Sequence, residues 1–450
     1  MKKFPQNTSK LTNNNIMEDE LNVIYNNNFE KNVLNLNETN LKKKGIFNSL
    51  NRILNIKNYF QTENIVKKKN FCFKLRYENS IPKKEKIRNP GIDFVRLIGM
   101  YLIVFNHLLS FGNGYKKYHK HKRQLQYIHI FTNWHNNGFS LISGIVGFKS
   151  SRYSNLLYLW IIVFFYSVSI HLLVQNFIKS YKIYNDISIE YFPIIYRRYW
   201  YFTAYFGMYL FIPVINKGIS CLSRSEFRWI VISTIGIFAF WRNLKNPKND
   251  VFNMNGGHSV IWLLTYYLTG AYIGKYRVNY SGLTKYIYCF ICVLIYIFSS
   301  YLYIIANNNI EFLGKRNFQK YIAAALRKML TFTFDSFVLI SQSTTACLFF
   351  LQIKFNKFIS QVICFLGPLS FGIYLIHFHP LIFNNTLKHI FDNDPENLSL
   401  NSTIILILLK SLKIFVFCII IDYFRSFIFE LFKLRKFCIF LENHMKNLIC

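Results

Sequence analysis

The feature that most constrains this chain is a series of long apolar blocks separated by short polar connections. Hydrophobic residues make up 52% of the 450 residues, and aromatic residues alone make up 19%. We count about ten blocks of membrane-spanning length: residues 92–111, 128–148, 156–174, 200–215, 229–241, 260–273, 286–306, 330–351, 365–383 and 404–429. Every backbone polar group in lipid must be paired internally, and blocks this long without strand-like alternation favour helices over a barrel. The sequence therefore predicts an all-α, polytopic membrane helix bundle.

The segments outside these blocks differ from them in composition. Residues 1–88 are rich in Asn and Lys, so we predict a disordered N-terminal extension there. Residues 89–430 form the predicted membrane domain, and residues 431–450 form a short basic C-terminal tail. The basic extension and the even number of blocks favour a cytosolic position for both termini.

The formal net charge of +33 raises the question of nucleic-acid binding. Lys and Arg are spread over the extension and nearly every connection, and no RNA- or DNA-binding motif accompanies them. We therefore interpret the charge as attraction to a membrane surface and expect no nucleic-acid partner.

Four of the nine cysteines of the chain lie inside the apolar blocks, which argues against a disulfide framework. Cys289 and Cys292 have C-x-x-C spacing, but no second pair accompanies them. Packing inside an apolar helix is therefore favoured over metal or redox chemistry, and no metal site is predicted.

Two ionisable side chains inside the first apolar block, Arg96 and His107, are the strongest candidates for a functional site. They are 107 − 96 = 11 residues apart, which places them within about 20° of the same helix face and about 16 Å apart along the axis. A charged side chain at membrane depth is costly and usually faces a bundle interior or a watery cavity. The alternatives are that Arg96 reaches the membrane surface while paired with Asp93, and that His107 is a hydrogen-bonded core residue.

A second group of candidates lies at the end of the second block. Ser143 and Gly144 bring small residues into a predicted helix, where they either allow close packing of a neighbouring helix or let a substrate approach the backbone. Lys149 and Arg152 then form a basic pair at the membrane exit, where an acidic or phosphorylated ligand could bind. Ordinary loop charge is the alternative explanation of that pair.

Near the ninth block, Tyr374 and His377 are three residues apart and share one helix face. They could hydrogen-bond to each other as a structural pair, or they could line a polar cavity. Together with Ser143, they are the candidate substrate-binding residues.

These motifs resemble the integral-membrane acyltransferase 3 family, whose members move acyl groups from acyl-CoA onto hydroxyls of sugars and other acceptors. The resemblance covers about residues 90–430. In that family the first helix carries an acidic residue and then an arginine, ten further residues and a histidine. An Ile-Ser-Gly element and a basic pair follow at the end of the second helix. The matching residues here are Asp93, Arg96, His107, Ile142, Ser143, Gly144, Lys149 and Arg152.

Further segments are similar to members that acetylate surface polysaccharides. These are residues 199–205, 257–262, 270–272 and 369–377. One departure is Lys149, which stands where the family commonly has an arginine. A lysine cannot form the bidentate contact that a guanidinium makes with a phosphate.

The resemblance implies an O-acyltransferase, and we expect an O-acetyltransferase. Its donor would be acyl-CoA, here acetyl-CoA, which is used as a substrate, and no permanently bound cofactor is expected. The acceptor would be a hydroxyl of a glycan, a polysaccharide or a lipid-linked sugar at the membrane.

The expected chemistry gives each candidate residue a role. A sugar hydroxyl is a weak nucleophile at neutral pH, and neutral imidazole, with an unperturbed pKa of about 6.5, is a suitable general base. We assign that role to His107. Arg96, oriented by Asp93, would attract the CoA phosphates together with Lys149 and Arg152. Donors for the developing oxyanion could come from the candidate substrate-binding residues Ser143, Tyr374 and His377.

Three alternatives stay open, one of which is a non-catalytic membrane protein that has kept the helix bundle. His107 could be acylated first and then pass the acyl group to the acceptor. The chain could also be a transporter in which Arg96 and His107 form a proton-coupled or anion-binding pathway. Transporters often show two related halves, and we find no such duplication in the sequence.

Overall fold

The structure, a computed structural model, describes residues 88–150, 152–177, 188–241, 250, 252–313 and 333–449. The predicted disordered extension lies outside these residues, except for residue 88. Every regular element in the described part of the chain is a helix, and no strand occurs there. The predicted all-α fold class is confirmed.

The longer helices are α4 (Pro90–Ser110), α6 (Lys122–Thr132), α7 (His135–Gly147), α8 (Ser154–Phe177), α10 (Trp200–Cys221), α11 (Arg224–Ile235), α13 (Val260–Tyr276), α14 (Gly282–Leu313), α16 (Phe337–Gln352), α17 (Lys357–Leu366), α18 (Ser370–His377), α20 (Leu400–Leu431) and α21 (Leu434–Ile449). Shorter elements connect them: α5 (Gly114–Lys117), η1 (His119–His121), α9 (Ser188–Tyr191), the π-helical turn η2 (Gly236–Trp241), η3 (Asn255–Gly257), η4 (Gly367–Leu369), α19 (Pro380–Asn385) and η5 (Leu387–His389).

Five helical segments of the described chain are long and apolar enough to cross a membrane. They are α4, α8, the Gly282–Ile305 part of α14, the segment Lys357–His377 that contains α17 and α18, and α20. Helix α16 is apolar but shorter. Apolar helices of membrane-spanning length are therefore confirmed, while the larger predicted number of spans stays a prediction.

Two of the predicted blocks are interrupted. The block 128–148 is not one helix, because Asn133 and Trp134 separate α6 from α7; asparagine side chains compete with the backbone for hydrogen bonds and favour such breaks. The block 365–383 is divided by η4, which contains Pro368, and by Pro380 at the start of α19. Proline lacks the N–H that a continuing helix needs. The second break leaves His377 at the C-terminal end of α18.

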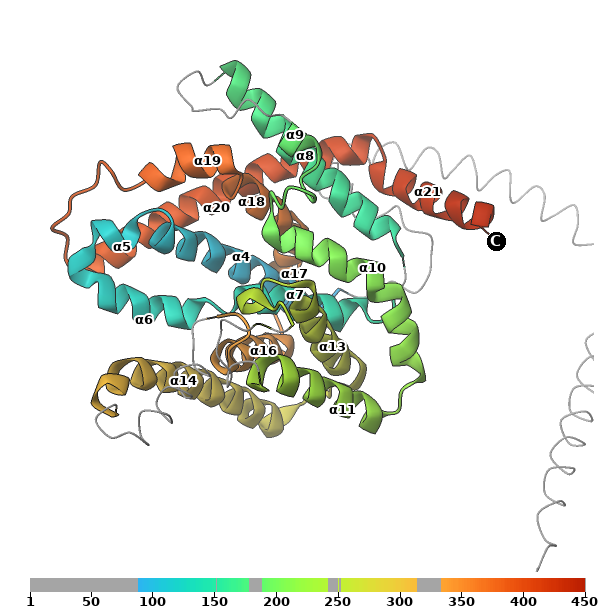
Figure 1. Ribbon diagram of the computed structural model, residues 1–450, viewed down its shortest axis with the longest axis horizontal. Helices are drawn as coiled ribbons and strands as arrows, with labels where there is room; N and C mark the ends of the chain where they lie inside the picture. The colour runs from blue at the N-terminus through green and yellow to red at the C-terminus, as the bar shows by residue number, and fades with distance from the viewer. Residues whose placement is uncertain are drawn as a thin grey trace, which may run out of the picture. The chain divides into compact units, whose positions relative to one another are not determined.

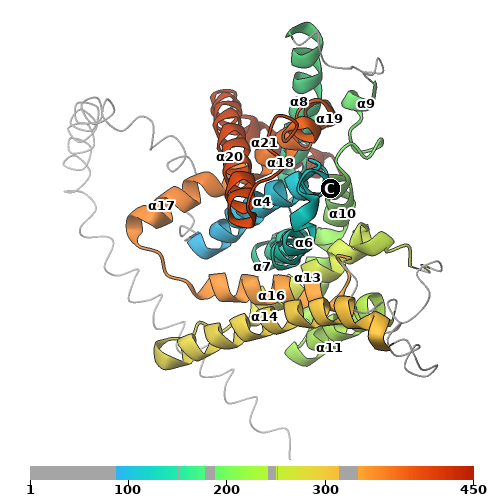
Figure 2. The same cartoon turned by 90° about the vertical axis from the view of Figure 1, so that its left-hand side faces the viewer.

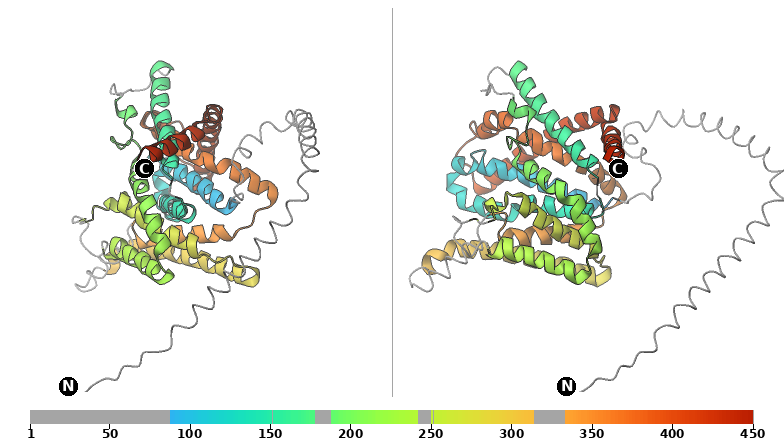
Figure 3. Two further views of the ribbon diagram at one scale, coloured as in Figure 1. Left: turned by 90° about the vertical axis from the view of Figure 1, so that its right-hand side faces the viewer. Right: turned by 45° about the vertical axis from the view of Figure 1, so that its right-hand side comes forward.

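Helix α4 lies between two groups of helices. In Figures 1 and 2, α8, α18 and α20 lie on one side of it and α13, α14 and α16 lie on the other. Both views of Figure 3 keep the red C-terminal helices on the opposite side of the bundle from the olive and yellow helices α13 and α14. Each side has its own buried cluster, which we call the first cluster (including Leu141 and Tyr266) and the second cluster (including Ile373). Helix α4 contributes to both, with Val95 in the first and Val104 in the second.

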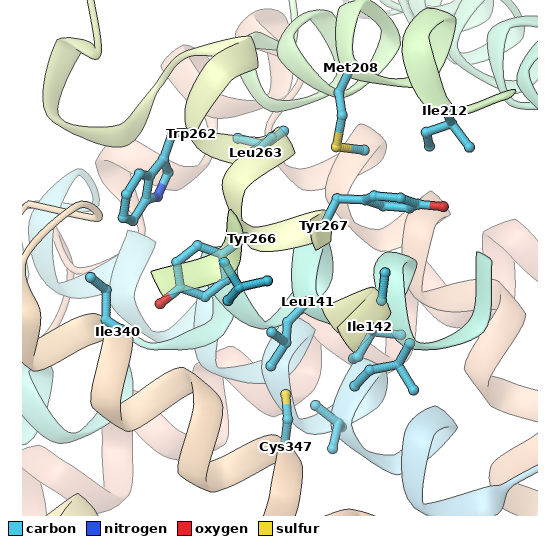
Figure 4. Close-up of a cluster of buried hydrophobic side chains, with 14 of the residues drawn as sticks. Leu141, Ile142, Met208, Ile212, Trp262, Leu263, Tyr266, Tyr267, Ile340 and Cys347 are labelled. Carbon is cyan, nitrogen blue, oxygen red and sulfur yellow. The ribbon is translucent and has the colours of Figure 1, made fainter. Parts of the chain in front are cut away.

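Helices α7 and α13 pack closely through glycine residues. A Cβ atom at Gly144 would collide with the backbone of Tyr267, and Cβ atoms at Gly270 and Gly274 would collide with the backbone of α7. Figure 4 shows Leu141 of α7 and Tyr267 of α13 in the side-chain cluster that this close approach creates. Small residues let membrane helices approach in this way. Gly144 therefore serves helix packing, which is the structural alternative that the sequence left open.

The predicted basic tail contains a helix, α21. Its Glu442 carboxylate accepts hydrogen bonds from the backbone N–H groups of Tyr153 (3.1 Å) and Ser154 (3.0 Å), at the start of α8. The first N–H groups of a helix have no partner within the helix. Glu442 therefore caps α8 and fixes α21 to it.

Candidate active site

The start of α4 holds a buried carboxylate between two arginines. Asn89 caps the helix by accepting a hydrogen bond from the Gly91 N–H (2.9 Å). The Asp93 side chain is 1% exposed and accepts hydrogen bonds from Arg88 (2.7 and 3.0 Å) and from Arg96 (2.6 Å). Charge-assisted hydrogen bonds of this kind are stronger than neutral ones. Asp93 is therefore in direct contact with Arg96, as its predicted orienting role requires.

His107 lies near the other end of α4, where aromatic rings surround it. Its imidazole is half-buried. The ring centroid lies 4.8 Å from that of Phe378, 5.4 Å from that of Phe111 and 5.2 Å from that of His377. His107 Nδ1 and His377 Nε2 are 3.0 Å apart. The two predicted histidines are thus brought together, although they come from different helices.

The surroundings of His377 determine which nitrogen atoms carry protons in the neutral pair. His377 Nδ1 lies 2.6 Å from the carbonyl oxygen of Ile373. A carbonyl oxygen only accepts hydrogen bonds, so this nitrogen carries the proton and His377 Nε2 is an acceptor. His107 Nδ1 must then be the donor between the two rings. His107 Nε2 consequently carries a lone pair, and no protein group in the described part of the chain hydrogen-bonds to it.

His377 and Tyr374 do not form the structural pair that their spacing allowed. His377 is 1% exposed and lies behind His107, where it orients the imidazole. The Tyr374 hydroxyl is buried near the backbone N–H groups of Tyr201 and Phe202, which can only donate, and no acceptor for its own proton is found among the described residues. The Tyr374 ring stacks on Phe378 at 5.9 Å and contacts Tyr199 at 5.7 Å. Tyr374 therefore belongs to the aromatic group around His107.

Ser143 faces a different helix from its neighbour Gly144. Its hydroxyl donates a hydrogen bond to the Phe139 carbonyl (2.9 Å) within α7. The Tyr205 hydroxyl of α10 lies close to Ser143 and within electrostatic range of Arg96. Ser143 therefore lies towards the Arg96 part of α4.

The basic pair at the end of α7 is exposed. The Lys149 ammonium lies over the Phe148 ring at 5.4 Å, and the backbone carbonyl of Arg152 accepts a hydrogen bond from the Tyr209 hydroxyl (3.3 Å). Within the described residues, neither basic side chain has a salt bridge. Both charges are accessible to an anionic ligand.

A family model described as an acyltransferase domain matches residues 89–423, which is more than half of the chain. The chain belongs to the acyltransferase 3 family. No curated protein and no solved structure matches it.

Membership in the acyltransferase 3 family confirms the predicted enzyme class, and the chain is an acyltransferase. Together with the apolar helices, it also identifies a membrane protein. The matched region contains Asp93, Arg96, His107 and His377. The transporter alternative receives no support from this assignment.

A polar group beside the histidine pair of this acyltransferase escaped the sequence reasoning. Asn106 donates a hydrogen bond from Nδ2 to His135 Nε2 (3.0 Å) and accepts one from the Thr132 hydroxyl at Oδ1 (2.7 Å). Asn106 and His135 are both buried. The contacts tie α4 to the start of α7 directly next to His107. The sequence signal that could have revealed this group is Asn106, a polar residue inside an apolar block.

A second buried polar group also escaped prediction. Glu190 is 1% exposed, accepts a hydrogen bond from Ser167 of α8 (2.6 Å) and is paired with Arg198. His379 Nε2 lies 3.5 Å from the Glu190 carboxylate. This group fixes the chain directly after His377 to α8. Its members lie far apart in the sequence, so their spacing carries no signal.

Proposed function

We propose that this acyltransferase is a multi-pass O-acetyltransferase that moves the acetyl group of acetyl-CoA onto a hydroxyl of a glycan, a polysaccharide or a lipid-linked sugar. The observation that carries the proposal is the lone pair on His107 Nε2. The contact with His377 orients this nitrogen, and Arg96 lies on the same helix. A general base and a cationic group for the donor phosphates are what acyl transfer from CoA needs.

The reaction proceeds by direct transfer in this proposal. The acceptor hydroxyl donates a hydrogen bond to His107 Nε2, which takes the proton as the oxygen attacks the thioester carbonyl carbon. The new C–O bond forms, and the carbonyl electrons move onto oxygen. Collapse of this intermediate breaks the C–S bond. The departing CoA thiolate takes the proton from the imidazolium, so His107 returns to its neutral form.

His377 acts as a positioning residue in this scheme. The imidazolium formed during attack carries a proton on both nitrogen atoms, and its Nδ1–H already points at His377 Nε2. The hydrogen bond therefore holds the ring in one tautomer before the reaction and stabilises its charge afterwards, which is the role of the third group in other base-assisted sites.

Tyr374 is the preferred oxyanion donor of the two hydroxyl candidates. The Ser143 proton is already used by the Phe139 carbonyl, whereas the proton of the buried Tyr374 hydroxyl has no acceptor among the described residues. A buried O–H group without an acceptor is costly, and a ligand oxygen that accepts its hydrogen bond would remove that cost.

The donor phosphates are bound by basic groups away from the histidine pair. Arg96 lies about 16 Å from His107 along the helix axis, and Lys149 and Arg152 are exposed at the end of α7. An extended CoA molecule would then keep its phosphates near the arginines while its thioester lies at the imidazole. Asp93 offsets part of the Arg96 charge and limits its motion.

The test is turnover of purified protein in detergent, with acetyl-CoA and a panel of glycan acceptors. CoA release is followed with a thiol reagent, and acetylated product is identified by mass spectrometry. His107→Ala should lower kcat by about 10³-fold while the protein stays folded. The matched control His389→Ala removes a histidine that is 63% exposed and should leave turnover unchanged. The absence of acceptor-dependent CoA release in the wild type, or full activity in His107→Ala, would refute the proposal.

A further inference from the structure

Three tyrosines on α10 form a continuous row of rings. Tyr201, Tyr205 and Tyr209 are spaced at i, i+4 and i+8, which places them along one helix face over about 12 Å. The ring centroids of Tyr201 and Tyr205 are 6.4 Å apart, and those of Tyr205 and Tyr209 are 5.9 Å apart. We call these residues the tyrosine row.

The two ends of the tyrosine row lie at the two ends of the proposed active site. At one end, the Tyr209 hydroxyl donates a hydrogen bond to the backbone carbonyl of Arg152 (3.3 Å). At the other end, the Tyr201 ring contacts the Tyr374 ring at 6.5 Å. Tyr374 stacks on Phe378, which contacts the His107 ring. The row therefore connects the basic pair with the imidazole.

The middle of the tyrosine row lies in the Arg96 region of the site. The Tyr205 hydroxyl lies close to Ser143 and within electrostatic range of Arg96. The line of aromatic side chains therefore passes the three sites that the proposed reaction uses. Their order along it is Arg152, Arg96 and His107.

The tyrosine row also follows the boundary between the two buried clusters. Tyr201 and Tyr205 pack against both the first and the second cluster. They are nevertheless only partly buried, unlike Tyr199 and Phe202 at 1% exposed. A narrow chain that follows this boundary would leave the close packing within each cluster intact.

The chemistry of the row fits the pantetheine arm of CoA. That arm is a narrow chain in which two amide groups alternate with short apolar stretches before the terminal sulfur. Tyrosine offers an apolar ring face and a hydroxyl at its rim, so a row of them can contact both kinds of group. We infer, building on the proposed function, that Tyr201, Tyr205 and Tyr209 line the path along which the acyl-pantetheine arm reaches His107.

The test is accessibility of a single introduced thiol at the middle of the row. Tyr205→Cys in the full chain is treated with a charged, water-soluble methanethiosulfonate, and modification at position 205 is read by peptide mass spectrometry, so the nine native cysteines do not interfere. We expect modification, and we expect CoA, supplied as its acetyl thioester so that no free CoA thiol consumes the reagent, to slow it about tenfold at ten times its Kd. Adenosine 3′,5′-bisphosphate, which has CoA phosphates but no pantetheine arm, should not protect.

Leu210→Cys is the matched control. It lies on the same helix, about 140° around the axis from Tyr205, and Leu210 is 46% exposed on that outer face. CoA should leave its reactivity unchanged. If Tyr205→Cys does not fold, Tyr201→Cys gives the same readout at the end of the row near Tyr374. An unreactive thiol, equal rates with and without CoA, or protection by the bisphosphate alone would overturn the inference.

The outcome can be separated from that of the proposed function. If the wild type turns over acetyl-CoA but CoA does not protect position 205, only the path is wrong. If the wild type neither turns over acetyl-CoA nor binds CoA, the proposed function fails. As a second readout, Tyr205→Trp should lower kcat/KM for acetyl-CoA at least about tenfold, because the larger ring obstructs the path.

Discussion

His107 Nδ1 and His377 Nε2 lie 3.0 Å apart, although 270 positions separate the two residues in the chain. One belongs to α4 and the other to the last turn of α18, which ends just before Pro380. The second ring nitrogen of His377 is occupied by a carbonyl of its own helix. A residue on another helix therefore determines which ring nitrogen of His107 is the basic one. Substitutions at position 377 should alter catalysis without altering the binding of acetyl-CoA.

His377→Ala should lower kcat by about 10²-fold, because His107 loses the acceptor that holds its reactive tautomer. KM for acetyl-CoA should stay unchanged, because the phosphate-binding groups are remote. His377→Gln should recover much of the lost rate, since its amide can accept from His107 and donate to the Ile373 carbonyl. Steady-state kinetics of the three proteins decide the point. Equal losses in both variants would argue against an orienting role.

Asp93→Asn should destabilise the fold by about 2 kcal/mol, because two partly exposed arginines lose their charge-assisted hydrogen bonds to the buried carboxylate. KM for acetyl-CoA should rise as Arg96 loses its fixed position. Thermal unfolding in detergent measures the loss of stability, and steady-state kinetics with varied acetyl-CoA measure the rise in KM. Glu396→Gln is the control, because Glu396 is 67% exposed and pairs with Lys117 at 3.5 Å; exposed pairs contribute little. Equal stability losses in both variants would contradict the predicted difference.

The attachment of α21 to α8 should depend on pH. Burial alone would raise the pKa of Glu442, but hydrogen bonds from Lys446 and from the N–H groups of Ser154 and Tyr153 lower it to about 2. An unfolded glutamate titrates at about 4.3. The folded pKa is the lower one, so the stabilisation is complete above the unfolded pKa and is lost as pH falls through the folded one.

Glu442→Gln should therefore lower Tm near neutral pH, and its difference from the wild type should shrink as pH falls from about 5 towards 2. Differential scanning fluorimetry across this pH range measures the difference in Tm between the two proteins. Glu430→Gln, which changes an exposed carboxylate on α20, provides the comparison. A difference between wild type and Glu442→Gln that stays constant down to low pH would show that the capping contact does not contribute through its charge.

The positions of Arg96 and His107 could be predicted because both lie in one helix. A separation of eleven residues determines their relative direction in any regular helix, so no tertiary information was needed. The contact between Asp93 and Arg96 is local for the same reason. The resemblance to the acyltransferase 3 family could be recognised from such short-range motifs and their order, and the family model then matched residues 89–423.

The partners of His107 could not be predicted in this way. The His377 contact and the Asn106–His135 contact depend on how α4 packs against α18 and α7, and no periodicity within a single segment encodes that packing. The spacing of Tyr374 and His377 even suggested a bond between them, whereas each faces a different neighbour. The breaks at Asn133 and near Pro380 had visible local causes, but hydropathy alone merged the helices on either side of them.

Gly270→Val should destabilise the bundle by about 2 kcal/mol or more, because a side chain at this position meets the backbone of Leu141 across the α7–α13 contact. Backbone cannot rotate away as a flexible side chain can, so the helices must separate and the first cluster loses packing. Gly218→Ala is the matched control, since nothing lies within 4 Å of a Cβ atom there and the residue is inside α10. That change should stabilise the protein by about 0.5 to 1 kcal/mol through helix propensity. Thermal unfolding of both variants should therefore shift in opposite directions, and a loss of stability in Gly218→Ala as large as that in Gly270→Val would show that close α7–α13 packing is not the cause.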